Sequence, residues 1–248
     1  MQTKTFELTY TKTEDNDGLV GVIIVAAGSA SRMGGVNKIL APLAGKPVIC
    51  HTLSAFNENP AISDIVLVTR EDMVLDLQKI ADEYGFLKVT DIITGGSCRE
   101  ESVKKGFERI TKNQNIKNVL IHDGARPLIS QKVITSVINA VEEFSAVVPA
   151  VSVKDTIKKI GVLGKVEETV DRSNLVSIQT PQGFEVETFK TALEKADDLS
   201  RFTDDASIAE AAGFFVYTVM GDYKNIKITT PGDVILAEAY LKASEGEE

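Results

Sequence analysis

The stretch VIIVAAGSASRMGGVNK, from Val22 to Lys38, decides the fold. Its first six residues are apolar or small, a run that is typical of a strand buried on both faces of a parallel sheet. The loop that follows is rich in Gly, Ser and Ala and carries two cations, Arg32 and Lys38. Small residues let backbone N–H groups approach a ligand closely and form an anion-binding concavity. The loop is therefore predicted to bind a polyphosphate.

Two common phosphate loops do not match this stretch. A dinucleotide fingerprint that begins at Gly28 needs glycines where the chain has Ala30 and Met33. A Walker A loop needs Gly in place of Met33, followed at once by Lys and Ser or Thr, but Gly34 comes next. An NAD-dependent oxidoreductase is therefore disfavoured. For the loop alone, a plain surface turn after a strand remains an alternative.

Composition limits the class of protein. The chain has 248 residues, 43% of them hydrophobic and 25% charged, which fits one large α/β domain. Its net charge of −9 argues against general nucleic-acid binding, which needs a basic face. No apolar run approaches the ~20 residues of a membrane span, and no secretory signal precedes the domain. Cys50 and Cys98 are too few for a disulfide framework, so a cytoplasmic protein is expected.

Strands and helices alternate along the first two thirds of the chain. Strands are predicted at 22–27, 64–69, 88–96, 118–123 and 146–151, and helices at 46–56, 73–85, 97–110 and 132–144. This alternation indicates a mostly parallel sheet with helices on both faces, in which ligands bind beyond the carboxyl ends of the strands. Gly28, Gly95 and Asp123 all fall at such ends, so three strands deliver their loops to one edge.

The alternation of strands and helices stops at residues 152–172, which are predicted to form two strands of alternating polar and apolar residues around a turn. A hairpin without an adjacent helix is marginal alone, so it is predicted to project as an arm and to pack on a partner subunit. A hairpin that lies on its own domain is the alternative. Later elements are a helix at 185–196, a helix capped by Thr203, strands at 214–220 and 225–231, and a closing helix at 233–243. Residues 1–20 form an extension, either an edge strand or a flexible tail, to a single domain at 21–245.

Seven motifs now stand in order: AAGSASRMGGVNK, GGSCREESV, HDGARP, VDR, TPQGF, TDDAS and NIKIT. Together they resemble the 2-C-methyl-D-erythritol 4-phosphate cytidylyltransferase family of the non-mevalonate isoprenoid pathway, over residues 21 to about 243. The resemblance implies a Rossmann-like nucleotidyltransferase domain that joins CTP to a polyol phosphate with Mg²⁺ and releases pyrophosphate. The ribitol-5-phosphate cytidylyltransferases are the alternative, but they typically have HDxVRP where this chain has HDGARP. A nucleotide-binding protein without activity is disfavoured by the retained cations.

The resemblance also implies a set of functional residues. Arg32, Lys38 and Lys227 would be catalytic, which the loop composition independently supports for the first two. The nucleotide would be bound by Ala26, Ala27, Gly28, Ala30, Arg32, Lys38, Gly95, Gly96, Ser102, Asp123 and Gly124. The second substrate would be bound by Asp123, Arg172, Thr180 and Lys227, together with Arg126, Asp155 and Thr156 from the other subunit of a homodimer formed through the arm. Asp123 would lie near the magnesium ion.

One departure from the family pattern surrounds the loop lysine. Many members have proline and glutamine beside it, whereas this chain has Asn37 and Ile39. Asparagine gives up the fixed φ of proline, so a less rigidly presented Lys38 is expected.

Overall fold

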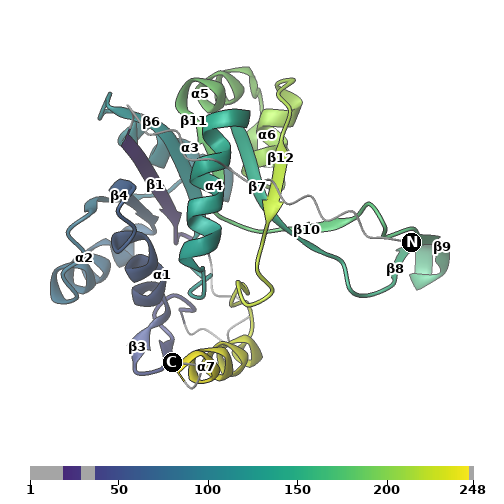
Figure 1. Ribbon diagram of the computed structural model, residues 1–248, viewed down its shortest axis with the longest axis horizontal. Helices are drawn as coiled ribbons and strands as arrows, with labels where there is room; N and C mark the ends of the chain where they lie inside the picture. Colours follow the sequence, from purple (N-terminus) through teal and green to yellow (C-terminus); the bar gives the residue numbers. More distant parts are fainter. Residues whose placement is uncertain (1–18, 29–36, 246–248) are drawn as a thin grey trace.

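The computed structural model describes residues 19–28 and 37–245, and its centre is a mostly parallel sheet (Figure 1). Among the described residues the strand order is β10-β7-β11-β6-β1-β4-β5, with β12 paired to β7. β1 runs parallel to β4 and β6, β5 runs parallel to β4, and β11 is inserted antiparallel between β6 and β7. The strands are β1 (Leu19–Val25), β4 (Ile62–Thr69), β5 (Val89–Thr94), β6 (Ile116–Asp123), β7 (Ala146–Ser152), β10 (Val176–Ile178), β11 (Gln182–Glu185) and β12 (Tyr217–Met220).

Helices cover both faces of this sheet, as the alternation predicts. One core contains side chains from α1 (Val48–Asn57), α2 (Val74–Glu83) and α4 (Gln131–Phe144). The opposite core contains side chains from α3 (Arg99–Ile110), α5 (Val186–Lys195) and α6 (Asp205–Ala211). Strand β1 contributes to both cores because its side chains alternate: Val22 and Ile24 belong to the first and Ile23 to the second. The buried central strand is therefore confirmed.

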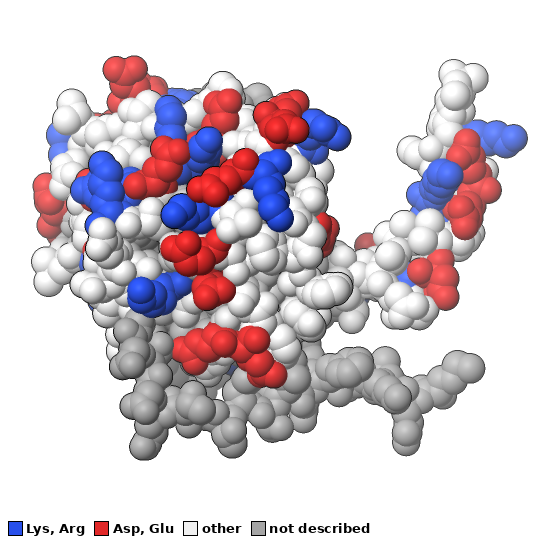
Figure 2. Space-filling view, turned by 90° about the horizontal axis from the view of Figure 1, so that it is seen from above, with Lys and Arg blue, Asp and Glu red and all other residues white. Residues whose placement is uncertain are grey.

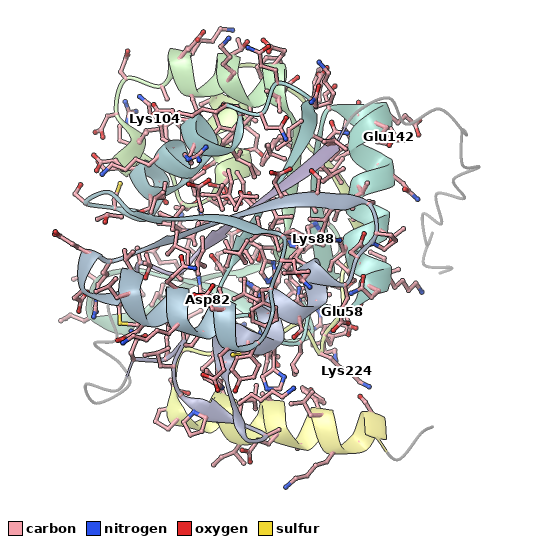
Figure 3. All side chains as sticks on the ribbon, turned by 90° about the vertical axis from the view of Figure 1, so that its left-hand side faces the viewer. Glu58, Asp82, Lys88, Lys104, Glu142 and Lys224 are labelled. Atoms are coloured by element: carbon pink, nitrogen blue, oxygen red, sulfur yellow. The ribbon has the colours of Figure 1, made fainter. Side chains whose placement is uncertain are left out.

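The outer surfaces of the helices are charged. Asp82 on α2, Lys104 on α3 and Glu142 on α4 are exposed, and Figure 3 labels them on the outside of the fold. On the face shown in Figure 2, acidic and basic side chains are interspersed rather than gathered by sign. No helix in the described ranges is both long enough and apolar enough to cross a bilayer.

Three α-helices in the described part of the chain begin at side-chain caps. Cys98 precedes α3 and Ser130 precedes α4, each accepting a hydrogen bond from a backbone N–H of the first turn. The cap of α6 is Asp204, which accepts from the Ser207 N–H at 3.0 Å. The prediction of Thr203 as this cap is therefore wrong by one residue. Both side chains can cap a helix, and the carboxylate is the stronger acceptor.

The hairpin at 152–172 leaves the body as an arm (Figure 1). Its strands β8 (Ile157–Ile160) and β9 (Val166–Val170) pair only with each other among the described residues. The arm begins beside the body, where the Tyr223 hydroxyl donates to the Ser152 carbonyl at 2.8 Å. Apolar side chains of the arm stay exposed, with Ile160 65% and Val162 86% accessible. The predicted projecting hairpin is thus present.

After β12 the chain continues along the carboxyl edge of the sheet, because β12 runs parallel to β7. Residues 225–231 were expected to form a short strand, but the structure gives them no strand. The Ile228 N–H donates to the Ala125 carbonyl at 2.8 Å, so this segment is tied across the end of β6 instead of joining the sheet. It leads to α7 (Pro231–Glu245), beside the short ribbon of β2 (Pro42–Leu43) and β3 (Lys46–Pro47). Ala237 of α7 and Ile228 of the preceding segment are buried in one cluster with Leu43 of the ribbon. This course brings Lys227 to the carboxyl ends of the central strands.

Candidate active site

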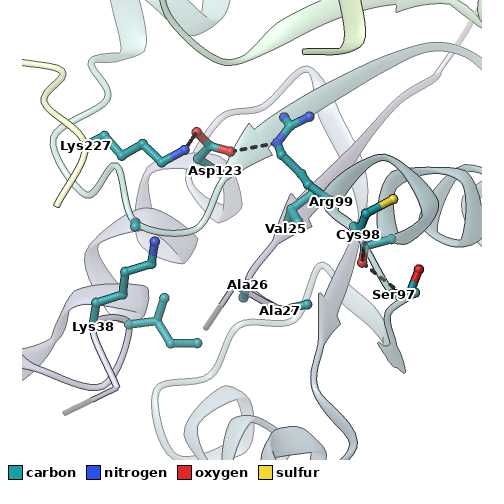
Figure 4. A pocket seen from close by; sticks show the side chains of 14 residues that line it. Val25, Ala26, Ala27, Lys38, Ser97, Cys98, Arg99, Asp123 and Lys227 are labelled. Atoms are coloured by element: carbon teal, nitrogen blue, oxygen red, sulfur yellow. Dashed lines mark hydrogen bonds and ion pairs between the residues drawn. The ribbon is translucent and has the colours of Figure 1, made fainter. Parts of the chain in front are cut away.

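A cavity of about 280 Å³ lies at the carboxyl ends of β1 and β6 (Figure 4). Its lining includes eight of the residues that the sequence singled out: Ala26, Ala27, Gly28, Lys38, Gly96, Ser102, Asp123 and Lys227. Gly95 and Gly124 are chain neighbours of that lining. Arg32 and Ala30 lie outside the described residues. The edge predicted from three strand ends is therefore a single cavity.

Lys38 extends into this cavity from the segment after the loop. A Cβ placed on Gly28 would lie 3.8 Å from the Lys38 Nζ, so the ammonium lies over the end of β1. Its two unusual neighbours are both anchored. The Asn37 Oδ1 accepts from the Ile39 N–H at 3.3 Å, and the Ile39 side chain is buried. A local side-chain turn thus takes the place of the proline ring, and the loss of rigidity expected for Lys38 is offset.

The opposite wall of the cavity is the turn between β5 and α3. The Gly96 N–H donates to the Ser102 Oγ at 3.0 Å, and this hydroxyl donates to the Cys98 carbonyl at 2.9 Å. A Cβ on Gly95 would lie 2.5 Å from the Ser102 Oγ, and one on Gly96 would lie 2.3 Å from the Cβ of Glu101. Gly96 therefore requires glycine, because the Glu101 Cβ and backbone cannot move aside, and a side chain on Gly95 would displace the Ser102 hydroxyl. The result is a fixed wall of backbone groups.

Asp123 stands at the centre of the charged groups (Figure 4). Its Oδ2 accepts from the Lys227 Nζ at 2.8 Å and lies 3.6 Å from the Arg126 Nε, while its Oδ1 accepts from the Arg99 Nε at 3.3 Å. Burial by itself would raise the pKa of Asp123, but Arg99 and Lys227 outweigh it and hold that pKa well below its ordinary value. Asp123 is thus ionised throughout the physiological range.

Arg99 is the principal residue that the sequence reasoning missed. Its Nη1 and Nη2 donate to the two carboxylate oxygens of Asp205 at 2.9 and 2.8 Å, and Asp205 is completely buried. Burial would lower the pKa of Arg99, but Asp205 and Asp123 together raise it above its ordinary value. Asp205 lies in the TDDAS motif and is not among the functional residues predicted from the sequence. The sequence signal that could have revealed Arg99 is its place beside the Gly95–Gly96 turn, within the motif GGSCREESV.

A second polar chain lies behind Asp123. The Thr180 Oγ1 accepts from the Asp123 N–H at 3.2 Å and lies 2.9 Å from the His122 Nδ1. The other ring nitrogen of His122 lies 3.2 Å from the Arg126 carbonyl, which can only accept. The ring therefore carries its proton on Nε2, and the Thr180 hydroxyl donates to Nδ1. Burial lowers the pKa of His122 to about 3, so the ring stays neutral.

The remaining predicted residues fall into two places. Arg126 is predicted to bind substrate from the partner subunit, which stays a prediction. Within its own chain its Nη1 donates to the Asn225 carbonyl at 2.8 Å, and its side chain is 13% exposed and lies beside Asp123. Arg172, Asp155 and Thr156 are exposed on the arm, away from the cavity lining. The Arg172 guanidinium donates to the Lys154 carbonyl.

The donor set suits a cation that arrives with phosphate ligands. No cluster of three or more His, Cys, Asp or Glu side chains that could hold a metal ion occurs in residues 19–28 and 37–245. Among the described residues that line the cavity, Asp123 is the single carboxylate. Mg²⁺ is commonly bound through one or two carboxylates together with substrate phosphates and water. The residues present therefore fit a magnesium ion held mainly by a nucleotide.

Comparison with known proteins identifies the family. Residues 20–243 match the family model of 2-C-methyl-D-erythritol 4-phosphate cytidylyltransferase. The chain belongs to this cytidylyltransferase family. A cytidylyltransferase of this name from Dehalococcoides mccartyi is 44% identical over 223 residues, which are 90% of this chain and 96% of that protein. The cytidylyltransferase of Alkaliphilus metalliredigens is 43% identical, over 92% of this chain and 96% of its own.

Solved structures agree with the assignment to the cytidylyltransferase family. The 4-diphosphocytidyl-2C-methyl-D-erythritol synthase of Anaerococcus prevotii has a TM-score of 0.78 and 32% identity, and the match covers 92% of this chain and all of that one. The cytidylyltransferase of Thermus thermophilus has a TM-score of 0.72 and 28% identity, over 90% of this chain and 99% of its own. The nucleotidyltransferase fold and the enzyme class expected from the motifs are therefore confirmed.

Proposed function

We propose that this chain converts CTP and 2-C-methyl-D-erythritol 4-phosphate to 4-diphosphocytidyl-2-C-methyl-D-erythritol and pyrophosphate, in isoprenoid precursor biosynthesis. The family match over residues 20–243 carries this conclusion. The cavity supports it, because the Gly-rich strand end, Lys38 and Lys227 converge on one space. We also propose that the reaction takes place in the cytoplasm, where CTP is available.

The chemistry asks for charge stabilisation more than for proton transfer. The attacking group is a phosphate monoester, which is largely ionised at pH 7 because its second pKa is about 6. An oxygen of this phosphate forms a bond to the α-phosphorus of CTP while the bond to the leaving pyrophosphate breaks. No general base is needed, and the buried neutral ring of His122 is not placed to act as one. Preorganised cations in a confined site are the expected source of catalysis.

Lys38 and Lys227 are proposed to supply these cations. Lys38 lies over the end of β1, where backbone N–H groups can meet the triphosphate. Lys227 is held at the other side of the cavity by its ion pair with Asp123. A cation on each side of the α-phosphorus would stabilise the incoming phosphate and the departing pyrophosphate. Arg32 is proposed to share the triphosphate with Lys38, although its position lies outside the described residues.

The wall formed by Gly95, Gly96 and Ser102 is proposed to read the cytosine. A rigid wall of backbone groups can reject a purine by size, and it can reject uracil by the reversed polarity of its position 4. Ala26, Ala27, Gly28, Ala30 and Gly124 would add backbone contacts to the nucleotide. Asp123 would orient the ribose or a magnesium ion, which when bound would neutralise charge on the phosphates.

The second substrate is proposed to be bound between this cavity and an arm. Lys227 lines the cavity and Thr180 lies behind Asp123, whereas Arg172, Asp155 and Thr156 lie on the projecting hairpin. The exposed apolar side chains of the arm suit burial against a second copy of the chain. In such a homodimer the arm of one subunit would complete the site of the other. The same arrangement would make activity depend on assembly.

A substrate panel tests the proposed function. Pyrophosphate release is measured with CTP and Mg²⁺, with methylerythritol phosphate and ribitol 5-phosphate offered in parallel and with ATP, GTP and UTP as nucleotide controls. Turnover confined to CTP and methylerythritol phosphate is the expected result. A preference for ribitol 5-phosphate would overturn the assignment of the second substrate, and silence with both would overturn the proposed reaction.

A further inference from the structure

We infer that Arg99 and Asp205 form a positioning device for the cytidylyl transfer, in which a fully buried carboxylate outside the cavity aligns Asp123 through a single guanidinium. The inference rests on the proposed function. Arg99 is the positioning residue that lines the cavity, and Asp205 acts only through it.

The guanidinium of Arg99 bridges two carboxylates. Arg99 uses the fork of its two Nη atoms on Asp205 and turns its Nε to the Oδ1 of Asp123. A planar fork bound at both tips has one orientation, because rotation would break both hydrogen bonds. The Nε direction, and with it the Asp123 Oδ1, is therefore set by Asp205.

Asp205 is itself anchored to the sheet. Asp205 is the first residue of α6, and the first turn of that helix is clamped to β11 by Gln182. The Gln182 Oε1 accepts from the Ala206 N–H at 2.8 Å, and its Nε2 donates to the Asp204 Oδ2 at 2.9 Å. Gln182 is only 1% exposed. The carboxylate that orients Arg99 thus belongs to a rigid part of the sheet and not to a loop.

Without Arg99, the carboxylate of Asp123 would lose the contact that holds its Oδ1. Its two oxygens are held from opposite sides, the Oδ1 by Arg99 and the Oδ2 by Lys227 (Figure 4). If Arg99 were released, the carboxylate could rotate toward Lys227 and draw that ammonium away from the reacting phosphates. Asp205 also balances the charge of Arg99, which keeps the guanidinium from binding the triphosphate in an unproductive way. Alignment at the reacting centre affects turnover more than affinity.

The matched test compares the same isosteric change at two aspartates. Asp205→Asn removes the charge that holds Arg99, whereas Asp198→Asn changes an exposed aspartate that caps the turn at 199–201 and does not line the cavity. We measure kcat, KM for CTP and thermal unfolding for each variant and for the unchanged enzyme. The expected result is a fall in kcat of about tenfold or more for Asp205→Asn, with KM for CTP unchanged or lowered. Asp198→Asn should retain the kcat of the unchanged enzyme.

A double variant separates positioning from a general structural role. If Asp205 acts only through Arg99, the variant with both Arg99→Gln and Asp205→Asn should be no slower than Arg99→Gln alone. If Asp205 supports α6 independently, the two losses should multiply, which would overturn the inference. Arg99→Lys provides a third measurement should Asp205→Asn fail to fold. A single ammonium cannot reproduce the fork, so full kcat in Arg99→Lys would also overturn it.

These measurements distinguish failure of the positioning role from failure of the proposed function. If the unchanged enzyme does not join CTP to methylerythritol phosphate, the reaction assignment fails. If it does, and Asp205→Asn matches Asp198→Asn in kcat and KM, the reaction stands and the positioning role is wrong.

Discussion

Lys227 and Asp123 form an ion pair of 2.8 Å between segments that are distant in sequence, one after β12 and one at the end of β6. The Lys227 side chain is 37% exposed, whereas that of Asp123 is 10% exposed. The lysine therefore keeps one side open to the cavity while the carboxylate fixes its direction. A cation that is held before substrate arrives needs no reorganisation during the reaction.

Removing this ammonium should slow the chemical step. We expect Lys227→Ala to lower kcat by about 10²- to 10³-fold, the usual loss when one preorganised charge-stabilising group is deleted. Steady-state kinetics with saturating CTP measures the change. Lys224→Ala in the same segment is the control, since Lys224 does not line the cavity. Equal kcat values for the two variants would contradict a catalytic role for Lys227.

The wall beside α3 should not tolerate a methyl group. A Cβ on Gly96 would lie 2.3 Å from the Cβ of Glu101 and 3.1 Å from its backbone carbon. We expect Gly96→Ala to raise KM for CTP about tenfold, equivalent to the 1–3 kcal/mol of a moderate steric conflict. Gly232→Ala is the matched control, because a Cβ there has no neighbour nearer than 3.8 Å. An unchanged KM in Gly96→Ala would remove this turn from the nucleotide site.

The arm should control assembly. We expect Ile160→Asp to weaken self-association at least about tenfold and to reduce turnover at low protein concentration, because a charge would replace an apolar contact. Sedimentation measures the first effect and pyrophosphate release the second. Leu87→Asp is the control, since Leu87 is similarly apolar and 92% exposed but lies on the body, before β5. If both variants sediment alike and work alike, the arm is not an interface.

His122 should make stability depend on pH. Its folded pKa of about 3 lies below the ordinary value of 6.5, so the unfolded state binds a proton that the folded state does not. The contribution of the neutral His122 ring to the free energy of unfolding is complete above pH ~6.5. It is lost as pH falls from there toward 3, at no more than about 1.4 kcal/mol per pH unit.

Denaturant unfolding between pH 4.5 and 7.5 measures this dependence. His122→Gln should be less stable at pH 7 but should lose less stability on acidification. The folded pKa of Asp123 is lowered, so its stabilisation is complete above about pH 4.5 and is lost only below that, because an ordinary aspartate titrates near 3.9. It therefore adds no slope over the pH range measured. Parallel curves for the two proteins would show that His122 is not held neutral.

Local patterns determined most of the fold in advance. The central strands and the helices between them follow from runs and periods that each element carries by itself, such as Val22 to Val25 or the face of α4. The segment around Lys227 was misjudged for a different reason. Its residues suit a strand, but the Ala125 carbonyl captures the Ile228 N–H, and tertiary contacts outweigh such local preferences.

The candidate site was predictable where a motif sits at a strand end. Gly28, Gly96 and Asp123 met in one cavity because parallel strands bring their carboxyl ends to one edge. The pairing of Arg99 with Asp205 was not predictable in this way. It joins the start of α3 to the start of α6, and no period or spacing links two helix starts so far apart. The approach of Arg126 to its own Asp123 was not predictable for a similar reason, since only the folded chain reveals it.

The buried carboxylate of Asp205 also affects how a substrate finds the site. Together with Asp123 it cancels much of the field of Arg99, Arg126 and Lys227, so the attraction of the cavity fades within a short distance. Beyond that distance an incoming nucleotide meets a chain of net charge −9. Moderate salt should therefore quicken the encounter by screening repulsion, the reverse of the salt dependence of enzymes that steer anions with a basic surface.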